Sequence, residues 1–235
     1  MSEGPLLEIT GLRKAYPGSS GFSLDIPSLE VRAGEVIGLI GRNGAGKTTL
    51  MRSLMGVVRA DAGEIRYEGR SVAHDLSELR RIVGYVPEEP CLHETMKVAA
   101  LLRFVGRLYP RWDQERAKEL LSFFGLDPQK KVRALSKGMR TKLLLVMAVC
   151  HSSKLLILDE PTSGFDPVAK DEFWVFLRRL LGRGEIKAAM ISSHQLGEVE
   201  DICNRAVFLE RGRIVFDQVQ FSAAELKGLF ARSGQ

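Results

Sequence analysis

Short apolar runs separated by turn residues fill the first third of the chain and return after residue 150. The runs at 36–40 and 155–158 are uninterrupted, a pattern typical of strands that are buried on both faces. Shorter or alternating segments predict further strands. These segments lie at 6–9, 22–24, 64–67, 82–86, 188–191, 206–209 and 213–216. A cluster of Pro, Gly and Ser at 17–21 predicts a turn between the first two.

A second pattern predicts helices, and it is concentrated between residues 88 and 150. There, apolar residues recur at the spacing of one helix face at Val98, Leu101, Leu102, Val105 and Leu108. Further helices are predicted at 113–124 and 136–150, and outside this stretch at 47–55, 168–181, 196–201 and 223–231. We therefore expect one α/β domain over 1–235, with a β-rich core at about 1–87 and 151–220. A helical subdomain would occupy about 88–150 and a short C-terminal helix about 222–232.

Composition narrows the class of protein. Hydrophobic residues make up 45% and charged residues 27%, the mixture of an ordinary globular protein and not of a disordered chain. The longest apolar run, 143–150, is far shorter than the ~20 residues of a bilayer span. The N-terminus lacks the pattern of a signal peptide, and three widely spaced cysteines favour a reducing cytoplasm. A net charge of +5 suits anionic ligands, but no block of like charges indicates a nucleic-acid tail.

One segment carries a phosphate-binding pattern. GRNGAGKT at 41–48 fits G-x-x-x-x-G-K-[ST], and it follows a predicted strand and opens a predicted helix, which is the context of a P-loop. Glycines let backbone N–H groups turn toward a phosphate, while the start of a helix adds positive potential. Lys47 is expected to reach the β- and γ-phosphates, and the Thr48 hydroxyl to bind Mg²⁺. The predicted cradle consists of Gly41, Asn43, Gly44, Ala45, Gly46, Lys47, Thr48 and Thr49.

A second segment ends a predicted strand in two carboxylates, Asp159 and Glu160. A carboxylate at the carboxyl edge of a strand beside a P-loop holds Mg²⁺ through water, and Asp159 suits this role. Glu160 points elsewhere, because it is the next residue, and is predicted to orient or deprotonate the attacking water. The alternative is an acidic surface turn before Pro161.

The chain here resembles the ATP-binding cassette (ABC) ATPases, over roughly residues 6–216. Seven motifs stand in the family's order: Tyr16, GRNGAGKT at 41–48, GYVPE at 84–88, LSKGM at 135–139, LLILDE at 155–160, SGFD at 163–166 and SSH at 192–194. The resemblance implies a P-loop NTPase core of the RecA-like type with an N-terminal antiparallel β subdomain and a helical insertion. It also implies ATP and Mg²⁺ as cofactors and Tyr16 stacked on adenine. The alternative for Tyr16 is a half-buried residue at the end of a strand.

The segment LSKGM is similar to the family signature. By this resemblance Ser136 and Gly138 contact the γ-phosphate that the P-loop of a second subunit holds, so that two subunits enclose two ATP molecules head to tail. From the residues alone, Ser136 is only the N-cap of a helix. The sequence departs from the commonest signature, because Lys137 stands in place of a glycine and Met139 in place of a glutamine. Lys137 is either a cation near the nucleotide or a solvated side chain.

Three more residues match the family pattern. His194 resembles the switch histidine, which bonds the γ-phosphate and keeps the water and Glu160 aligned. Glu88 stands where the family usually has a glutamine that contacts Mg²⁺ and water, and it is either a Mg²⁺ ligand or part of a solvated acidic pair. Asp166 resembles the residue that connects the two sites across the dimer, or else it caps the helix that follows. The other histidines match no motif and are expected at the surface or at helix caps; they are His74, His93 and His151.

These observations predict a transport ATPase. Two identical or similar cassettes would close on ATP, loosen after hydrolysis, and move a separate membrane-spanning subunit from the inner face of the cell membrane. That subunit is expected to bind around residues 88–96 and the helical insertion. The segments PEEP, SKGM and SSHQL look similar to bacterial exporters of the multidrug or antibiotic-resistance type, which points to export.

Three other functions compete with transport. One is an ABC ATPase that acts on nucleic acid or ribosomes, but such relatives usually carry two cassettes or a long coiled coil. Neither feature is visible, so no nucleic-acid partner is expected. A P-loop GTPase or small-molecule kinase is the second, although the guanine-reading pattern N-K-x-D is absent from the sequence. The third is a nucleotide-binding regulator without turnover, which a measurement of phosphate release would identify.

Overall fold

The computed structural model describes residues 4–16, 21–72 and 76–233. The chain divides into two units, one formed by residues 1–80 and 187–235 and the other by residues 81–186. Of the sequence-based predictions, His74 and most of the turn at 17–21 lie outside the described residues. The predicted limits of the helical subdomain stay a prediction.

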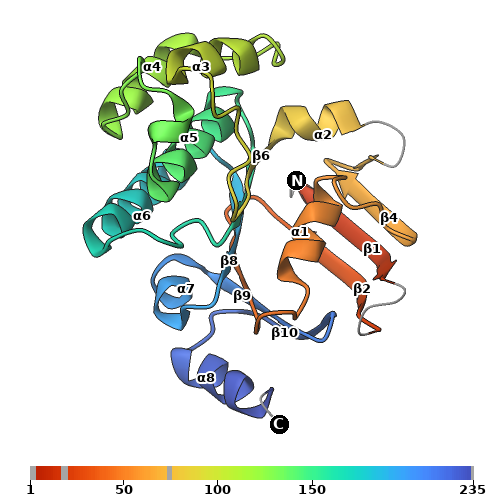
Figure 1. Cartoon of the computed structure of the whole chain (residues 1–235). Coiled ribbons are helices and arrows are strands. Elements are labelled where there is room, and N and C mark those ends of the chain that lie inside the picture. The colour runs from red at the N-terminus through yellow and green to blue at the C-terminus, as the bar shows by residue number, and fades with distance from the viewer. Residues whose placement is uncertain (1–3, 17–20, 73–75, 234–235) are drawn as a thin grey trace. The chain divides into compact units, whose positions relative to one another are not determined.

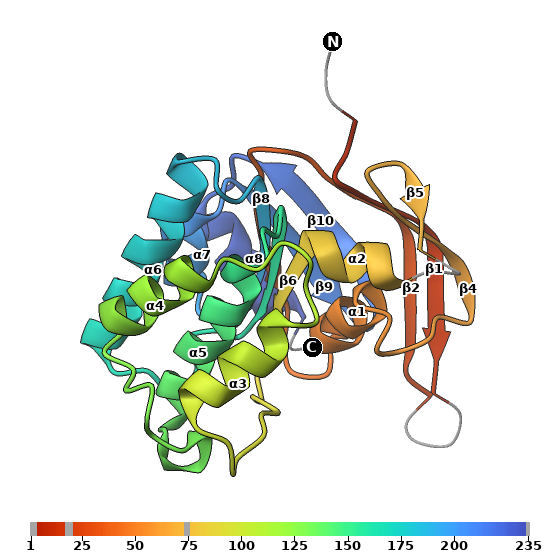
Figure 2. The same cartoon turned by 90° about the horizontal axis from the view of Figure 1, so that it is seen from above.

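The first unit begins with an antiparallel sheet in the strand order β2-β1-β4-β5. Its strands are β1 (Leu7–Ala15), β2 (Ser23–Val31), β4 (Ala62–Tyr67) and β5 (Arg70–Ser71). Figure 2 shows β2, β1 and β4 side by side. Leu7, Ile9 and Leu12 of β1 are buried, as expected for a strand with one face on a core. Pro27 is tolerated in β2 because this strand lies at the sheet edge and need not donate from every residue.

A mainly parallel layer follows in the same unit, in the order β10-β9-β3-β8. Its strands are β3 (Val36–Ile40), β8 (Ala188–Ser193), β9 (Arg205–Glu210) and β10 (Arg213–Val219). β8 and β9 both pair in parallel with β3, whose five residues are all buried. β10 returns antiparallel to β9. The parallel strands therefore bring the loops that follow them to one edge of the sheet.

Helices α1 (Lys47–Leu54), α7 (Leu196–Ile202) and α8 (Ala223–Arg232) belong to this unit. Helix α2 (Leu76–Ile82) begins in it and ends in the second unit. α7 and α8 lie next to each other (Figure 1). α8 begins with a capping box between Ser222 and Glu225, which satisfies the N–H groups at its start. Both helices share a buried cluster with β3 and β9 that contains Ile40, Val199, Ala206, Phe208 and Leu226.

The second unit contains two parallel strands and four helices among its described elements. These are β6 (Val83–Val86), β7 (Leu155–Asp159), α3 (Val98–Gly106), α4 (Gln114–Phe123), α5 (Lys137–Cys150) and α6 (Pro167–Gly182), with a short 3-10 turn at Val132–Ala134. α5 packs closely on β6, because a Cβ added to Gly84 would lie 2.6 Å from the carbonyl oxygen of Ala148. α6 buries the predicted face of Phe173, Phe176, Leu177 and Leu180.

The α/β class, the antiparallel N-terminal sheet and the main helices are confirmed. Two details were wrong. Ile82 was predicted in a strand but is the last residue of α2, a helix too short to show a clear periodicity. The helical repeat was extended to Leu108, but α3 ends at Gly106, where the Trp112 ring packs so closely that a Cβ would lie 2.8 Å from it.

None of the helices in the described part of the chain combines the length and the apolar content that crossing a bilayer requires.

Candidate nucleotide-binding site

The P-loop joins the buried strand β3 to helix α1 in the first unit. The first turn of α1 contains no acidic residue, and the first N–H groups of a helix have no acceptor within it, so this end attracts anions. Lys47 is only 7% exposed and donates to the carbonyl oxygens of Gly41 at 2.7 Å and Arg42 at 3.4 Å. The ammonium group of Lys47 therefore lies at the carbonyl oxygens that begin the loop. Among the other loop residues, Asn43 and Gly44 are exposed, Ala45 and Gly46 are buried, and Thr48 and Thr49 are half-buried.

Two glycines of the loop are required by close packing. A Cβ on Gly41 would lie 2.3 Å from the carbonyl oxygen of Leu209. A Cβ on Gly46 would lie 2.9 Å from the ring of Phe22, and the φ of 108° at Gly46 is one that favours glycine. The packing of the first unit thus restricts these two positions of the loop to glycine.

The strands that precede His194 and the P-loop are neighbours in the sheet. His194 directly follows β8, whose last residue, Ser193, pairs with Ile40, the last residue of β3. The P-loop starts at the next residue, Gly41. Since neighbouring parallel strands end at the same edge, the two motifs leave the sheet together, and the His194 side chain is exposed there.

Tyr16 provides an aromatic surface in the same unit. It follows β1, its side chain is 36% exposed, and its ring centroid lies 6.3 Å from that of Phe22. Phe22 in turn lies against Gly46 of the P-loop. The Lys14 ammonium is 5.6 Å from the Tyr16 ring centroid, a cation–π distance. Tyr16 is therefore linked to the P-loop through one ring, while its stacking on adenine stays a prediction.

The predicted acidic residues stand at the ends of two neighbouring strands of the second unit. β6 and β7 end side by side because Val86 pairs with Leu158. Glu88 follows the first strand; Asp159 ends the second and Glu160 follows it. Asp159 is 1% exposed, Glu160 is half-buried and Glu88 is exposed.

Glu160 has an unusual backbone conformation, with a φ of 45°. A positive φ is uncommon for residues other than glycine, and such strained residues gather at active sites. Among the described residues other than glycine, four more have a positive φ, so the role of Glu160 stays a prediction; they are Glu68, Ser152, Arg211 and Gln220.

The signature segment forms the exposed start of α5. The Ser136 hydroxyl is the N-cap and accepts from the Met139 N–H at 3.2 Å, so the capping role inferred from the residues is confirmed. Gly138 lies against Phe165, whose ring a Cβ would approach to 3.2 Å. Lys137 donates to the Ser163 hydroxyl at 3.3 Å, so in this unit the signature packs on the segment 163–166.

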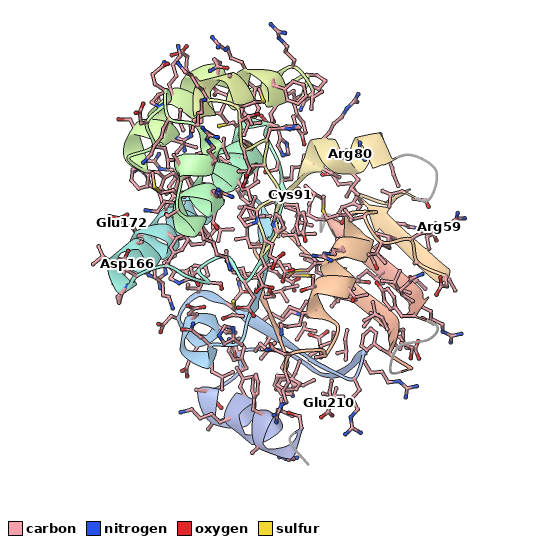
Figure 3. The ribbon with its side chains drawn as sticks, viewed as in Figure 1. Arg59, Arg80, Cys91, Asp166, Glu172 and Glu210 are labelled. Atoms are coloured by element: carbon pink, nitrogen blue, oxygen red, sulfur yellow. The ribbon has the colours of Figure 1, made fainter. Side chains whose placement is uncertain are left out.

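Asp166 is the N-cap of α6, because its side chain accepts from the Ala169 N–H at 2.9 Å. Figure 3 shows it at the start of that helix, with Glu172 farther along. A connection between two sites across a dimer stays a prediction for Asp166.

The residues predicted to bind Mg²⁺ are chemically suitable. Thr48, Asp159 and Glu88 offer a hydroxyl and carboxylates, the oxygen ligands that Mg²⁺ prefers together with phosphate oxygens. No group of three or more His, Cys, Asp or Glu side chains in the described ranges is arranged to hold a metal by itself. Thr48 belongs to the first unit and the two carboxylates to the second, so a Mg²⁺ site that they form together stays a prediction.

A model of the family described as ABC transporter matches residues 24–163, which include the P-loop, the signature and the acidic strand. The chain belongs to the ABC transporter family. It is an ATP-binding ATPase subunit of this family, as the seven motifs indicate.

Relatives and solved structures agree with this assignment. The uncharacterized ABC transporter ATP-binding protein YdbJ of Bacillus subtilis (strain 168) is 34% identical, over 89% of this chain and 68% of that protein. The Nod factor export ATP-binding protein I of Ralstonia nicotianae is 35% identical, over 89% of this chain and 65% of that protein. This chain thus spans about two thirds of the length of these relatives. A solved ATP-binding subunit of an ABC transporter has a TM-score of 0.82 and 28% identity, and covers 98% of this chain and 95% of its own.

Two aromatic residues pack on glycines of the predicted site, a role that was not predicted from the sequence, although Phe165 stands in the motif at 163–166. Phe22 and Phe165 lie against Gly46 and Gly138, two glycines of the predicted site. Their packing depends on tertiary structure. The sequence shows only that Phe22 begins a predicted strand and that Phe165 lies within a family motif.

Proposed function

We propose that two copies of this subunit, or this subunit and a close relative, bind two ATP molecules between them and drive a membrane-spanning partner. The exposed start of α5 carries this proposal. A helix of 14 residues there presents the Ser136 hydroxyl and a first turn without acidic residues, on an exposed surface. Such an end suits the γ-phosphate of an ATP held by another subunit.

Hydrolysis needs mainly positioning and charge stabilisation. Lys47 and His194 contact the phosphate oxygens, and Tyr16 holds the adenine. Mg²⁺ bound at Thr48, Asp159 and Glu88 would neutralise phosphate charge. Glu160 accepts a proton from the water whose oxygen attacks the γ-phosphorus, while the bond to the β-phosphate oxygen breaks.

Release of phosphate after hydrolysis removes the γ-phosphate, the group that both subunits bind in this proposal. The pair therefore loosens, with Asp166 linking the two sites, and the docked membrane subunit changes conformation. We place that subunit on residues 88–96 and the helical insertion, at the inner face of the cell membrane. Similarity to Nod factor export proteins supports export as the direction.

The variant Glu160→Gln tests the proposal. We expect it to bind ATP normally, to lose turnover by about 10²–10⁴-fold, and to form a dimer with ATP and Mg²⁺ that light scattering detects. The control is Asp171→Asn, which changes an exposed acid of α6 that has no role in the proposal. Adding Ser136→Ala to Glu160→Gln should weaken the dimer. Normal turnover by Glu160→Gln, or an ATP-loaded protein that remains monomeric at every concentration, would contradict the proposal.

A further inference from the structure

The residues before and after His194 in the chain, Ser193 and Gln195, are both held by hydrogen bonds of the Ser193 hydroxyl. The Ser193 hydroxyl, which precedes His194, donates to a carboxylate oxygen of Glu198 at 2.8 Å. The same oxygen of Ser193 accepts from the Gln195 N–H, which follows His194, at 3.0 Å. The backbone of His194 is therefore tied at the residue before it and at the residue after it.

Burial makes these bonds important. Ser193 is only 2% exposed, and a buried hydroxyl without hydrogen bonds is unfavourable. Glu198 lies in the first turn of α7, where a carboxylate interacts favourably with the helix dipole. The bond between them is charge-assisted, and such bonds are stronger than those between neutral groups.

The helix that carries Glu198 is itself fixed to the sheet. Val199 is 1% exposed, and it packs so closely on β3 that a Cβ added to Gly38 would lie 2.4 Å from it. On the other side the Ala223 N–H, at the start of α8, donates to Glu200 at 3.2 Å. Glu198 thus holds Ser193 from a rigid support built on the strand that leads into the P-loop.

We propose that Ser193 and Glu198 are positioning residues that hold His194 in the orientation needed for the reaction. This inference rests on the proposed role of His194 at the γ-phosphate. Neither residue touches the nucleotide in this proposal, so their loss reduces the rate of the chemical step and leaves ATP binding intact. A misplacement of about 1 Å is enough to slow an enzyme strongly.

The first experiment measures, without any nucleotide, how firmly the backbone around His194 is fixed. Amide hydrogen exchange at Gln195 is followed by NMR in the full chain. Ser193→Ala and Glu198→Ala should speed this exchange by about tenfold, because each removes a hydrogen bond made by the Ser193 hydroxyl. Asp201→Ala, which removes an exposed carboxylate from the same helix, is the control and should leave Gln195 unchanged. Unchanged exchange in the first two variants overturns the proposal.

The second experiment measures ATP turnover. Glu198→Ala should lower kcat by about tenfold with an unaltered KM for ATP. Glu198→Gln should restore most of the activity, because its amide oxygen still accepts from Ser193. A rise in KM with kcat unchanged, or the same loss in Glu198→Gln and Glu198→Ala, contradicts a positioning role.

A double-mutant cycle separates this inference from the proposed function. In a His194→Ala background, Glu198→Ala should have no further effect on kcat. An equal fold-loss in both backgrounds shows that Glu198 does not act through His194. Normal turnover by His194→Ala alone refutes the proposed role of His194, and with it any catalytic effect of Ser193 and Glu198. The amide exchange of Gln195 still reports whether Ser193 and Glu198 fix the backbone around residue 194.

Discussion

Adding one methyl group to Gly41 tests how the P-loop is held. Gly41 is buried with a φ of 156°, and a Cβ there would lie 2.3 Å from the Leu209 carbonyl oxygen and 3.0 Å from the Cβ of Ala45. The nearest neighbour is the backbone of β9, which cannot swing aside as a flexible side chain does. In Gly41→Ala the P-loop itself must therefore move.

Two terms contribute to the expected loss of stability. Overpacking of a close contact costs about 1–3 kcal/mol, and a backbone conformation that disfavours side chains costs about 1–3 kcal/mol. The free energy of unfolding should fall by about 2–6 kcal/mol, seen as a lower denaturant midpoint by circular dichroism. Affinity for ATP, measured by calorimetry, should fall as well, because the displaced loop no longer directs its N–H groups at one point.

Gly44→Ala is the matched control for stability. Gly44 also has a positive φ, 81°, but an added Cβ would have no neighbour within 4 Å. Only the backbone term applies, about 1–2 kcal/mol. A wild-type midpoint for Gly41→Ala, or equal destabilisation by the two variants, would refute the argument from packing.

Three further predictions concern other parts of the chain. Lys47→Ala should lose most of the affinity for ATP in calorimetry, whereas Arg52→Ala, an exposed change in the same helix, should not; unchanged binding by Lys47→Ala contradicts the P-loop assignment. Burial keeps the pKa of His151 below its usual 6.5. The unfolded chain then binds more protons below about pH 6.5, so stability should fall as the pH is lowered through this window, and His151→Asn should remove that part of the dependence. Phe173→Ala should lower the free energy of unfolding by about 3–5 kcal/mol, because Phe173 is fully buried, whereas Val175→Ala, with an exposed side chain, should change it little in the same denaturant titration.

The buried strands and the amphipathic helices could be predicted from local pattern. β3 and β7 are apolar throughout because they are buried on both faces, and α6 shows its buried side at the spacing of a helix. The P-loop could also be predicted from the sequence, since glycine, lysine and threonine at fixed positions after a strand have a direct physical role in phosphate binding. Short helices give a weaker signal, because seven residues contain less than two helical turns. Of the two described helices of this length, α7 was predicted at 196–201 and α2 was not.

The sequence by itself thus determined which residues match the phosphate-binding pattern and which segments form the core, because both depend on residue type and short-range spacing. Only the tertiary structure decided which of them meet. The pairing of Ser193 with Ile40 brings His194 next to the P-loop, and the pairing of Val86 with Leu158 gathers the acidic residues at one edge. Strand order and register arise from contacts between residues far apart in the chain, and no local pattern encodes them. The same holds for Glu198, whose role is visible only from the hydroxyl that it binds.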